Sequence, residues 1–213
     1  MGSDNKTGGR AFPNKMEIMS PQAVDKIIDV TLGYLEDTGI KFDSHEQTYD
    51  ILSKAGCDIS SDGMVKFPSD VTKDCLGQCP DSYKWWNREG TECVEYGSGN
   101  TCFISSCWAP NYIDPYTREK KLGDQEGIAI LTKLSDALPE IDISGIPIAT
   151  GDFVADGATM MANTTKPVHF GAGENADALR GLIELGSAIR GGSEKLKEKP
   201  YFTLHINPEL LRY

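Results

Sequence analysis

Residues 124–149, DQEGIAILTKLSDALPEIDISGIPIA, predict a helix that is followed by a short buried strand. The helix covers 124–138 and the strand covers 141–149. The same order recurs twice further along the chain, with helices over 154–163 and 175–190 and strands over 167–171 and 201–206. Helices that alternate with short apolar strands build parallel sheets. We therefore expect an α/β fold whose strands in this part of the chain are parallel.

The first third of the sequence predicts helices and one hairpin. Residues 1–15 have no apolar periodicity and predict a flexible start. Ser20 can cap a helix whose first turn contains Pro21 and which ends at Gly39. Further elements are expected as helices over 44–55 and 69–78 and as a hairpin over 58–67, with Asp62-Gly63 at its turn.

Residues 82–113 contain short runs rich in Tyr, Trp, Thr, Val and Phe, which predict antiparallel strands. Residues 117–123 then predict a basic connection into the next helix. These patterns divide the chain into three expected parts. They are a flexible start (1–15), a helical region with a strand-rich insert (16–123), and the first part of a β/α barrel (124–213).

Composition and charge exclude several classes of function. The formal net charge is -11, so the field of the chain repels nucleic-acid phosphates and acidic lipids. No apolar run approaches the roughly twenty residues that cross a bilayer. The six cysteines lack the paired two-residue spacing of structural zinc sites. We expect a cytoplasmic protein with reduced thiols and no bound metal, without nucleic-acid or membrane partners.

Several short segments resemble the trimethylamine methyltransferase family, and the resemblance covers nearly all residues after the flexible start. The segments are 35–40 (LEDTGI), 63–68 (GMVKFP), 109–114 (APNYID), 134–142 (LSDALPEID), 163–168 (NTTKPV), and 199–202 (KPYF) with the following Asn207-Pro208. The matched region corresponds to about the first half of a family member. The resemblance implies a partial TIM (β/α) barrel preceded by an N-terminal helical region and a small antiparallel strand insert.

The resemblance also implies an activity, namely transfer of a methyl group from a methylated amine to the cobalt of a corrinoid. The corrinoid (cobalamin) would be carried by a cognate partner protein. The amine would be trimethylamine or a quaternary amine such as glycine betaine, and the sequence leaves that choice open. An alternative is a truncated, non-catalytic fragment that binds the corrinoid protein. Because an open half barrel exposes strand edges, a homo-oligomer is also expected.

Parallel barrels place their chemistry at the carboxyl ends of the strands, so candidate site residues lie there. Aromatic faces can hold a methylated cation, and small residues let a bulky corrinoid approach the backbone. The substrate-binding candidates are Trp108, Tyr112, Asp152, Phe153 and His205. The cofactor-binding candidates are His169, Gly171, Gly173 and Asn207. Each has a structural alternative: aromatic residues pack in cores, Asp152 can cap a helix, and glycines serve tight turns.

A nucleotide-binding enzyme on a doubly wound sheet is a different class, and the sequence argues against it. Such enzymes carry a glycine fingerprint between the first parallel strand and its helix. Gly171-Ala172-Gly173 matches it only in part, because Ala176 stands where the third glycine belongs.

Overall fold

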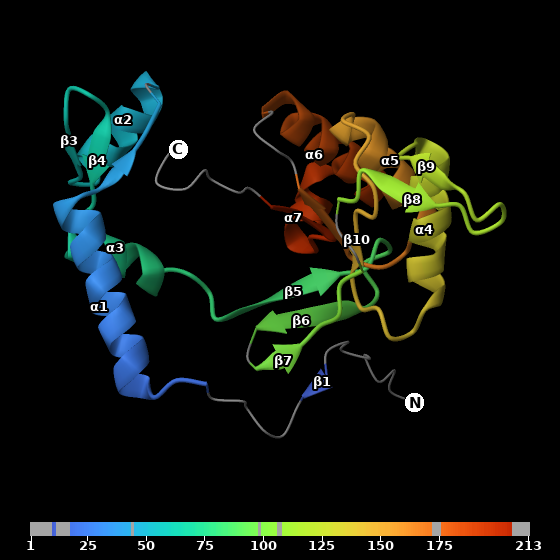
Figure 1. Cartoon of the computed structure of the whole chain (residues 1–213), viewed down its shortest axis with the longest axis horizontal. Coiled ribbons are helices and arrows are strands. Elements are labelled where there is room, and N and C mark those ends of the chain that lie inside the picture. Colours follow the sequence, from blue (N-terminus) through green and yellow to red (C-terminus); the bar gives the residue numbers. More distant parts are fainter. Residues whose placement is uncertain are drawn as a thin grey trace. The chain divides into compact units, whose positions relative to one another are not determined.

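The computed structural model describes residues 10–11, 18–43, 45–97, 99–105, 108–171 and 176–205. They form two compact units, of which one contains residues 18–80 and the other contains residues 81–205 with strand β1 (Arg10–Ala11). Both units combine helices and short strands, so the chain is mixed α/β (Figure 1). The strand-rich segment that begins at Ser82 lies in the same unit as the alternating helices and strands.

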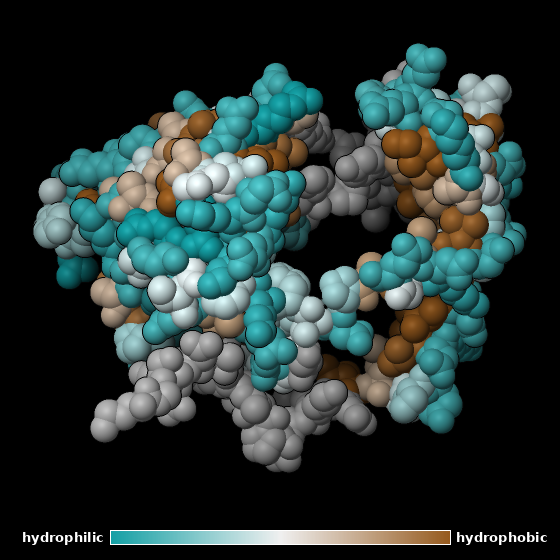
Figure 2. Space-filling model, turned by 180° about the vertical axis from the view of Figure 1, so that it is seen from behind, coloured by the Kyte–Doolittle hydropathy of each residue, from teal (hydrophilic) through white to brown (hydrophobic). Residues whose placement is uncertain are grey.

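The smaller unit contains three helices and three short strands. They are α1 (Pro21–Asp37), β2 (Ile40–Lys41), α2 (Glu46–Lys54), β3 (Asp58–Ile59), β4 (Met64–Lys66) and α3 (Ser69–Gly77). The predicted cap of the first helix is confirmed, because Ser20 Oγ accepts a hydrogen bond from Ala23 N–H (3.2 Å). Ile27 and Ile28 stay exposed, and Figure 2 shows hydrophobic surface along this unit.

The strands of the smaller unit pair antiparallel in the order β2-β4-β3, which confirms the hairpin expected over 58–67. Gly63 forms its turn with φ +83°, a left-handed backbone that glycine adopts without strain. Gly39 also has a positive φ of +78°, and any Cβ there would collide with the carbonyl group of Val65. Glycine at position 39 is therefore required both to end α1 and to let β4 approach.

The larger unit is built around a parallel sheet with the strand order β10-β11-β12. The strands are β10 (Ser144–Gly145), β11 (Val168–Gly171) and β12 (Phe202–His205). The helices are α4 (Gln125–Ala137), α5 (Phe153–Asn163), α6 (Ala176–Arg190) and α7 (Ser193–Glu198). The expected alternation and parallel pairing are confirmed, whereas the short helix α7 was not predicted. The described strands do not form a closed barrel.

A further extended segment runs parallel to β10 and corrects the expectation that residues 82–113 form antiparallel strands throughout. Bridges join Ile104 to Ile143 and Ala109 to Ile148, both in parallel orientation. Backbone hydrogen bonds support them, such as the one that Trp108 N–H donates to the Ile146 carbonyl (2.9 Å). The expectation was wrong here because this segment finds its partner beyond the next helix, where no local turn signals the pairing.

The main core lies between the parallel sheet and its helices. Val168 and Phe170 of β11 are fully buried there, and Phe202 of β12 packs against Phe170 with ring centroids 6.1 Å apart. A Cβ at Gly157 of α5 would collide with Leu182 of α6, so a glycine is what lets these two helices approach. Among the described helices, none combines the length and apolar character needed to cross a bilayer.

An antiparallel hairpin of β5 (Ser82–Trp86) and β6 (Cys93–Gly97) is joined to the amino ends of β11 and β12. Trp86 N–H donates to the Pro200 carbonyl (2.9 Å), and Arg88 N–H donates to the Thr165 carbonyl (2.8 Å). Arg190 strengthens this junction by donating to the Arg88 carbonyl (2.9 Å). Strand β7 (Asn100–Thr101) follows and pairs antiparallel with β1.

Residues 117–123 form more than the basic connection that the sequence predicts. Within them, β9 (Lys120–Leu122) pairs antiparallel with β8 (Asn111–Ile113). The turn between these strands is organised by Asp114, whose Oδ1 accepts hydrogen bonds from the N–H groups of Tyr116 (2.8 Å) and Thr117 (2.9 Å). Its Oδ2 contacts Lys121 Nζ (2.5 Å). These donors, Lys121 foremost, lower the pKa of Asp114 to about 2.

Replacing Asp114 with asparagine is expected to remove part of the loss of stability that the protein shows in acid. The folded state favours the deprotonated carboxyl, so its contribution is present above the usual pKa of 3.8 and is lost as the pH falls towards 2. Urea denaturation at about pH 5 and about pH 2.5 measures this effect. The stability difference between wild type and Asp114→Asn should shrink at the lower pH, and an unchanged difference would contradict the assignment.

Candidate functional site

The two faces of the parallel sheet have different chemistry, because side chains alternate along each strand. Val168 and Phe170 point into the helix-side core, so His169 between them points to the opposite face. The strand register pairs His169 with Thr203 and Gly171 with His205. Thr203 and His205 therefore share the face of His169, away from the helices.

A pocket of about 240 Å³ lies on this second face. The β5–β6 hairpin contributes one part of its lining and the parallel strands contribute the other. The lining residues are Tyr83, Trp85, Tyr96, Ile104, His169, Thr203, Leu204 and His205. Among these described residues there is no carboxylate, ammonium or guanidinium group. We call this site the ring pocket.

His169 contacts three other residues of the ring pocket, namely Thr203, Trp85 and His205. Its Nδ1 shares a hydrogen bond with Thr203 Oγ1 (2.9 Å). The Trp85 ring lies edge-on to it at 6.0 Å between centroids, and the His205 ring lies edge-on at 5.7 Å. Burial lowers the pKa of His169, and the neighbouring His205 lowers it further. His169 is therefore a neutral imidazole at physiological pH.

The structure brings together two of the residues that the sequence singled out, His169 and His205. Gly171 is the last residue of β11 and pairs with His205. Gly173 and Asn207 lie outside the described residues. Cofactor binding by His169, Gly171, Gly173 and Asn207 stays a prediction.

The other predicted site residues lie away from the ring pocket. Tyr112 is buried in the helix-side core and donates a hydrogen bond to Asp124 Oδ1 (3.2 Å). Trp108 is 37% exposed and has a left-handed backbone (φ +63°). Asp152 caps α5 through a hydrogen bond from Ala155 N–H (3.0 Å), and Phe153 is the first residue of that helix. These hydrogen bonds of Tyr112 and Asp152 are structural, and the substrate contacts expected of all four residues stay predictions.

Sequence reasoning missed the three hairpin residues of the ring pocket, Tyr83, Trp85 and Tyr96. A signal was present, because Tyr83 and Trp85 stand two positions apart on β5 and so share one face. The register then pairs Tyr83 with Tyr96. The sequence alone does not show that this aromatic face packs against the parallel sheet.

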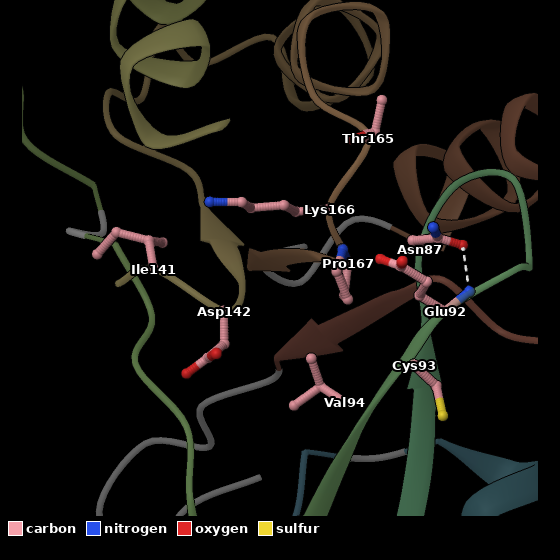
Figure 3. A pocket seen from close by; sticks show the side chains of 9 residues that line it. All are labelled: Asn87, Glu92, Cys93, Val94, Ile141, Asp142, Thr165, Lys166 and Pro167. Carbon is pink, nitrogen blue, oxygen red and sulfur yellow. Dashed lines mark hydrogen bonds between the residues drawn. The ribbon is translucent and has the colours of Figure 1, made fainter. Parts of the chain in front are cut away.

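A second pocket, of about 250 Å³, lies where the hairpin meets the amino ends of β10 and β11 (Figure 3). Lys166, Asp142 and Glu92 contribute its charged groups, and Figure 3 shows the first two directed away from Glu92. Lys166 Nζ donates to the carbonyls of Ser135 (2.7 Å) and Leu138 (2.5 Å) at the end of α4.

The polar groups of this second pocket serve the neighbouring backbone. Asp142 Oδ2 accepts a hydrogen bond from Phe103 N–H (2.9 Å), and Asn87 Oδ1 accepts one from Glu92 N–H (3.2 Å), which Figure 3 draws. The pocket also lies at the amino ends of the strands, whereas barrel enzymes place their chemistry at the carboxyl ends. We therefore regard it as a structural junction and the ring pocket as the candidate functional site.

Comparison with known proteins identifies similar sequences over nearly the whole chain. The model of the trimethylamine methyltransferase family matches residues 6–209. A trimethylamine methyltransferase of Desulfitobacterium hafniense (strain DSM 10664 / DCB-2) is 28% identical, with 84% of this chain and 37% of the relative covered. A trimethylamine methyltransferase of Methanosarcina barkeri is 25% identical, with 98% of this chain and 44% of the relative covered.

A third similar protein is named for a different substrate. The glycine betaine methyltransferase of Desulfitobacterium hafniense (strain Y51) is 25% identical, with 93% of this chain and 42% of the relative covered. The chain therefore spans about two fifths of the length of each of these three relatives.

Proposed function

Because the chain belongs to the trimethylamine methyltransferase family, we propose that it takes part in methyl transfer from a methylated amine to a corrinoid on a separate protein. The observation that carries this proposal is the family match over residues 6–209. Relatives named for trimethylamine and for glycine betaine support both substrates, so the proposal covers tertiary and quaternary methylated amines.

The chemistry requires a methylated nitrogen that carries positive charge. A neutral amine is a better leaving group than an amide anion, so the carbon–nitrogen bond breaks readily only when its electron pair returns to a cationic nitrogen. The electron pair of reduced cobalt forms the new bond to the methyl carbon. A quaternary amine has this charge already, whereas trimethylamine must first gain it. The acidic chain, with a net charge of -11, favours the approach of such cations.

The size of the ring pocket bears on where the corrinoid would be held. Pockets that enclose drug-sized ligands have volumes of about 300–1,000 Å³, and a corrinoid is larger than such ligands. The ring pocket, at about 240 Å³, does not fit a resident corrinoid. In the proposal the corrinoid is therefore not resident in the ring pocket; it is carried by a partner protein and acts as the methyl acceptor.

We also propose that the larger unit is the first part of a β/α barrel. Support comes from the parallel strands β10, β11 and β12, from the parallel bridges of Ile104 to Ile143 and of Ala109 to Ile148, and from the intervening helices packed on one face. A second candidate function is that the chain binds the corrinoid protein without turnover.

The experiment that tests the proposal mixes the purified chain with a corrinoid protein reduced to the cobalt(I) state. On addition of trimethylamine or glycine betaine, the cobalt(I) absorption bands should be replaced by those of methyl-cobalt(III). A sample without amine is the control. Binding to the corrinoid protein without an amine-dependent spectral change would favour the second candidate. Absence of both binding and spectral change would remove the proposal.

A further inference from the structure

Aromatic rings in the ring pocket form a continuous series from the hairpin to the last parallel strand. Tyr83 and Tyr96 have ring centroids 5.3 Å apart, and Tyr96 and Trp85 are 6.5 Å apart. Trp85 then contacts His169 (6.0 Å), which contacts His205 (5.7 Å). The first two of these four contacts lie within the hairpin, the third joins the hairpin to the sheet, and the fourth lies within the sheet. All five rings line the same pocket.

We propose that the ring pocket binds the methylated ammonium group of the substrate, with its methyl groups against the rings of Tyr83, Trp85, Tyr96 and His169. This inference rests on the proposed function and names the part of the chain that recognises the amine. It differs from the sequence-based candidates Trp108, Tyr112 and Phe153, none of which lines the ring pocket.

The electrostatics of the ring pocket suit such a cation. A fully methylated ammonium ion has no hydrogen to donate, so it gains nothing from hydrogen-bond acceptors and is held by the negative faces of aromatic rings. Burial keeps His169 neutral by lowering its pKa, which removes a positive charge that would repel the ligand. Burial also raises the pKa of Tyr83, so its ring remains a neutral phenol.

The position of the ring pocket agrees with catalysis at the carboxyl ends of the strands. His205 is the last residue of β12, so the pocket extends to the end of the sheet at which barrel enzymes hold their substrates. The hairpin side of the pocket is partly open, because Tyr96 is 46% exposed and Tyr83 is also exposed. A small cation can therefore enter from that side.

The test is a titration of the purified chain with tetramethylammonium chloride, followed by isothermal titration calorimetry. Saturable binding is expected. Replacing Tyr96 with leucine should weaken it on the order of five- to tenfold, since one ring face is lost. Tyr96→Phe keeps the ring and should bind as the wild type does. Tyr116→Leu, at a tyrosine that is 82% exposed and outside the pocket, is the matched control and should also bind normally.

A second comparison separates cation recognition from simple apolar packing. Choline and 3,3-dimethylbutan-1-ol have nearly the same shape, but only choline carries the positive charge, so choline should bind at least severalfold more tightly. Equal binding of the two, or equal effects of Tyr96→Leu and Tyr116→Leu, would overturn the inference. So would a lack of saturable binding by the folded wild type. Cation binding without methyl transfer would leave this site assignment intact and count against methyl transfer by the chain instead.

Discussion

Replacing Phe170 with alanine is expected to lower the free energy of unfolding by about 3–5 kcal/mol. Phe170 is 1% exposed, and its ring contacts the Phe202 ring on the neighbouring strand. It also lies within 3.6 Å of the position that a Cβ at Gly157 would occupy, so α5 packs directly over it. Deleting the ring removes buried apolar surface and leaves a cavity that a sheet fixed on both sides cannot close. Urea denaturation followed by circular dichroism measures the loss.

Two control variants make this expectation specific. Phe170→Leu keeps most of the apolar volume and should cost less than half as much as alanine. Tyr116→Ala removes an aromatic ring that is 82% exposed and should change stability by no more than about 0.5 kcal/mol. If Phe170→Ala and Tyr116→Ala had similar effects, the helix-side face of β11 would not be the centre of the core.

Replacing Asp156 with alanine is expected to cost about 2–4 kcal/mol, the second largest effect. The Asp156 side chain is almost fully buried on α5, and its carboxylate organises the loop that follows β10. It accepts hydrogen bonds from Thr150 N–H (2.9 Å), Thr150 Oγ1 (2.5 Å) and Gln125 Nε2 (2.6 Å). Alanine would leave these three donors without the carboxylate that accepts their hydrogen bonds.

Asp152 offers a matched comparison four residues earlier on the same element. Its carboxylate is exposed and makes one capping hydrogen bond, to Ala155 N–H, so Asp152→Ala should cost only about 1 kcal/mol. Thermal or urea denaturation of the two variants under the same conditions gives the comparison. A loss for Asp156→Ala no greater than that for Asp152→Ala would mean that the buried hydrogen bonds do not hold the loop.

The sequence predicted those helices and strands that are determined by residues close together in the chain. Ser20 and Pro21 start α1 because a side-chain acceptor and a fixed φ act within one turn. The alternation after Asp124 predicted parallel pairing of β10, β11 and β12, since helices that connect short apolar strands return the chain in the same direction. His169 and His205 were likewise found because each stands on one of these strands.

Features that depend on distant partners were not predicted. Ile104 and Ala109 stand among residues whose sequence predicts antiparallel strands, and only their bridges to Ile143 and Ile148 show that they pair in parallel. For the same reason Tyr83, Trp85 and Tyr96 were not recognised as site residues. Their aromatic face has a function only where the hairpin packs against His169, and that packing joins parts of the chain more than 70 residues apart.

The hydrogen bonds that anchor the β5–β6 hairpin come from residues that are synthesised much later, and this affects folding during translation. Lys199 Nζ donates to the Gly90 carbonyl across 109 positions of sequence, and Arg190 reaches the Arg88 carbonyl across 102. At a synthesis rate of about 5–20 residues per second, the nascent hairpin waits on the order of ten seconds before its anchors leave the ribosome. During that interval the aromatic side chains of β5 and β6 are not yet packed against the parallel sheet. We expect chaperones to bind this segment mainly at that stage.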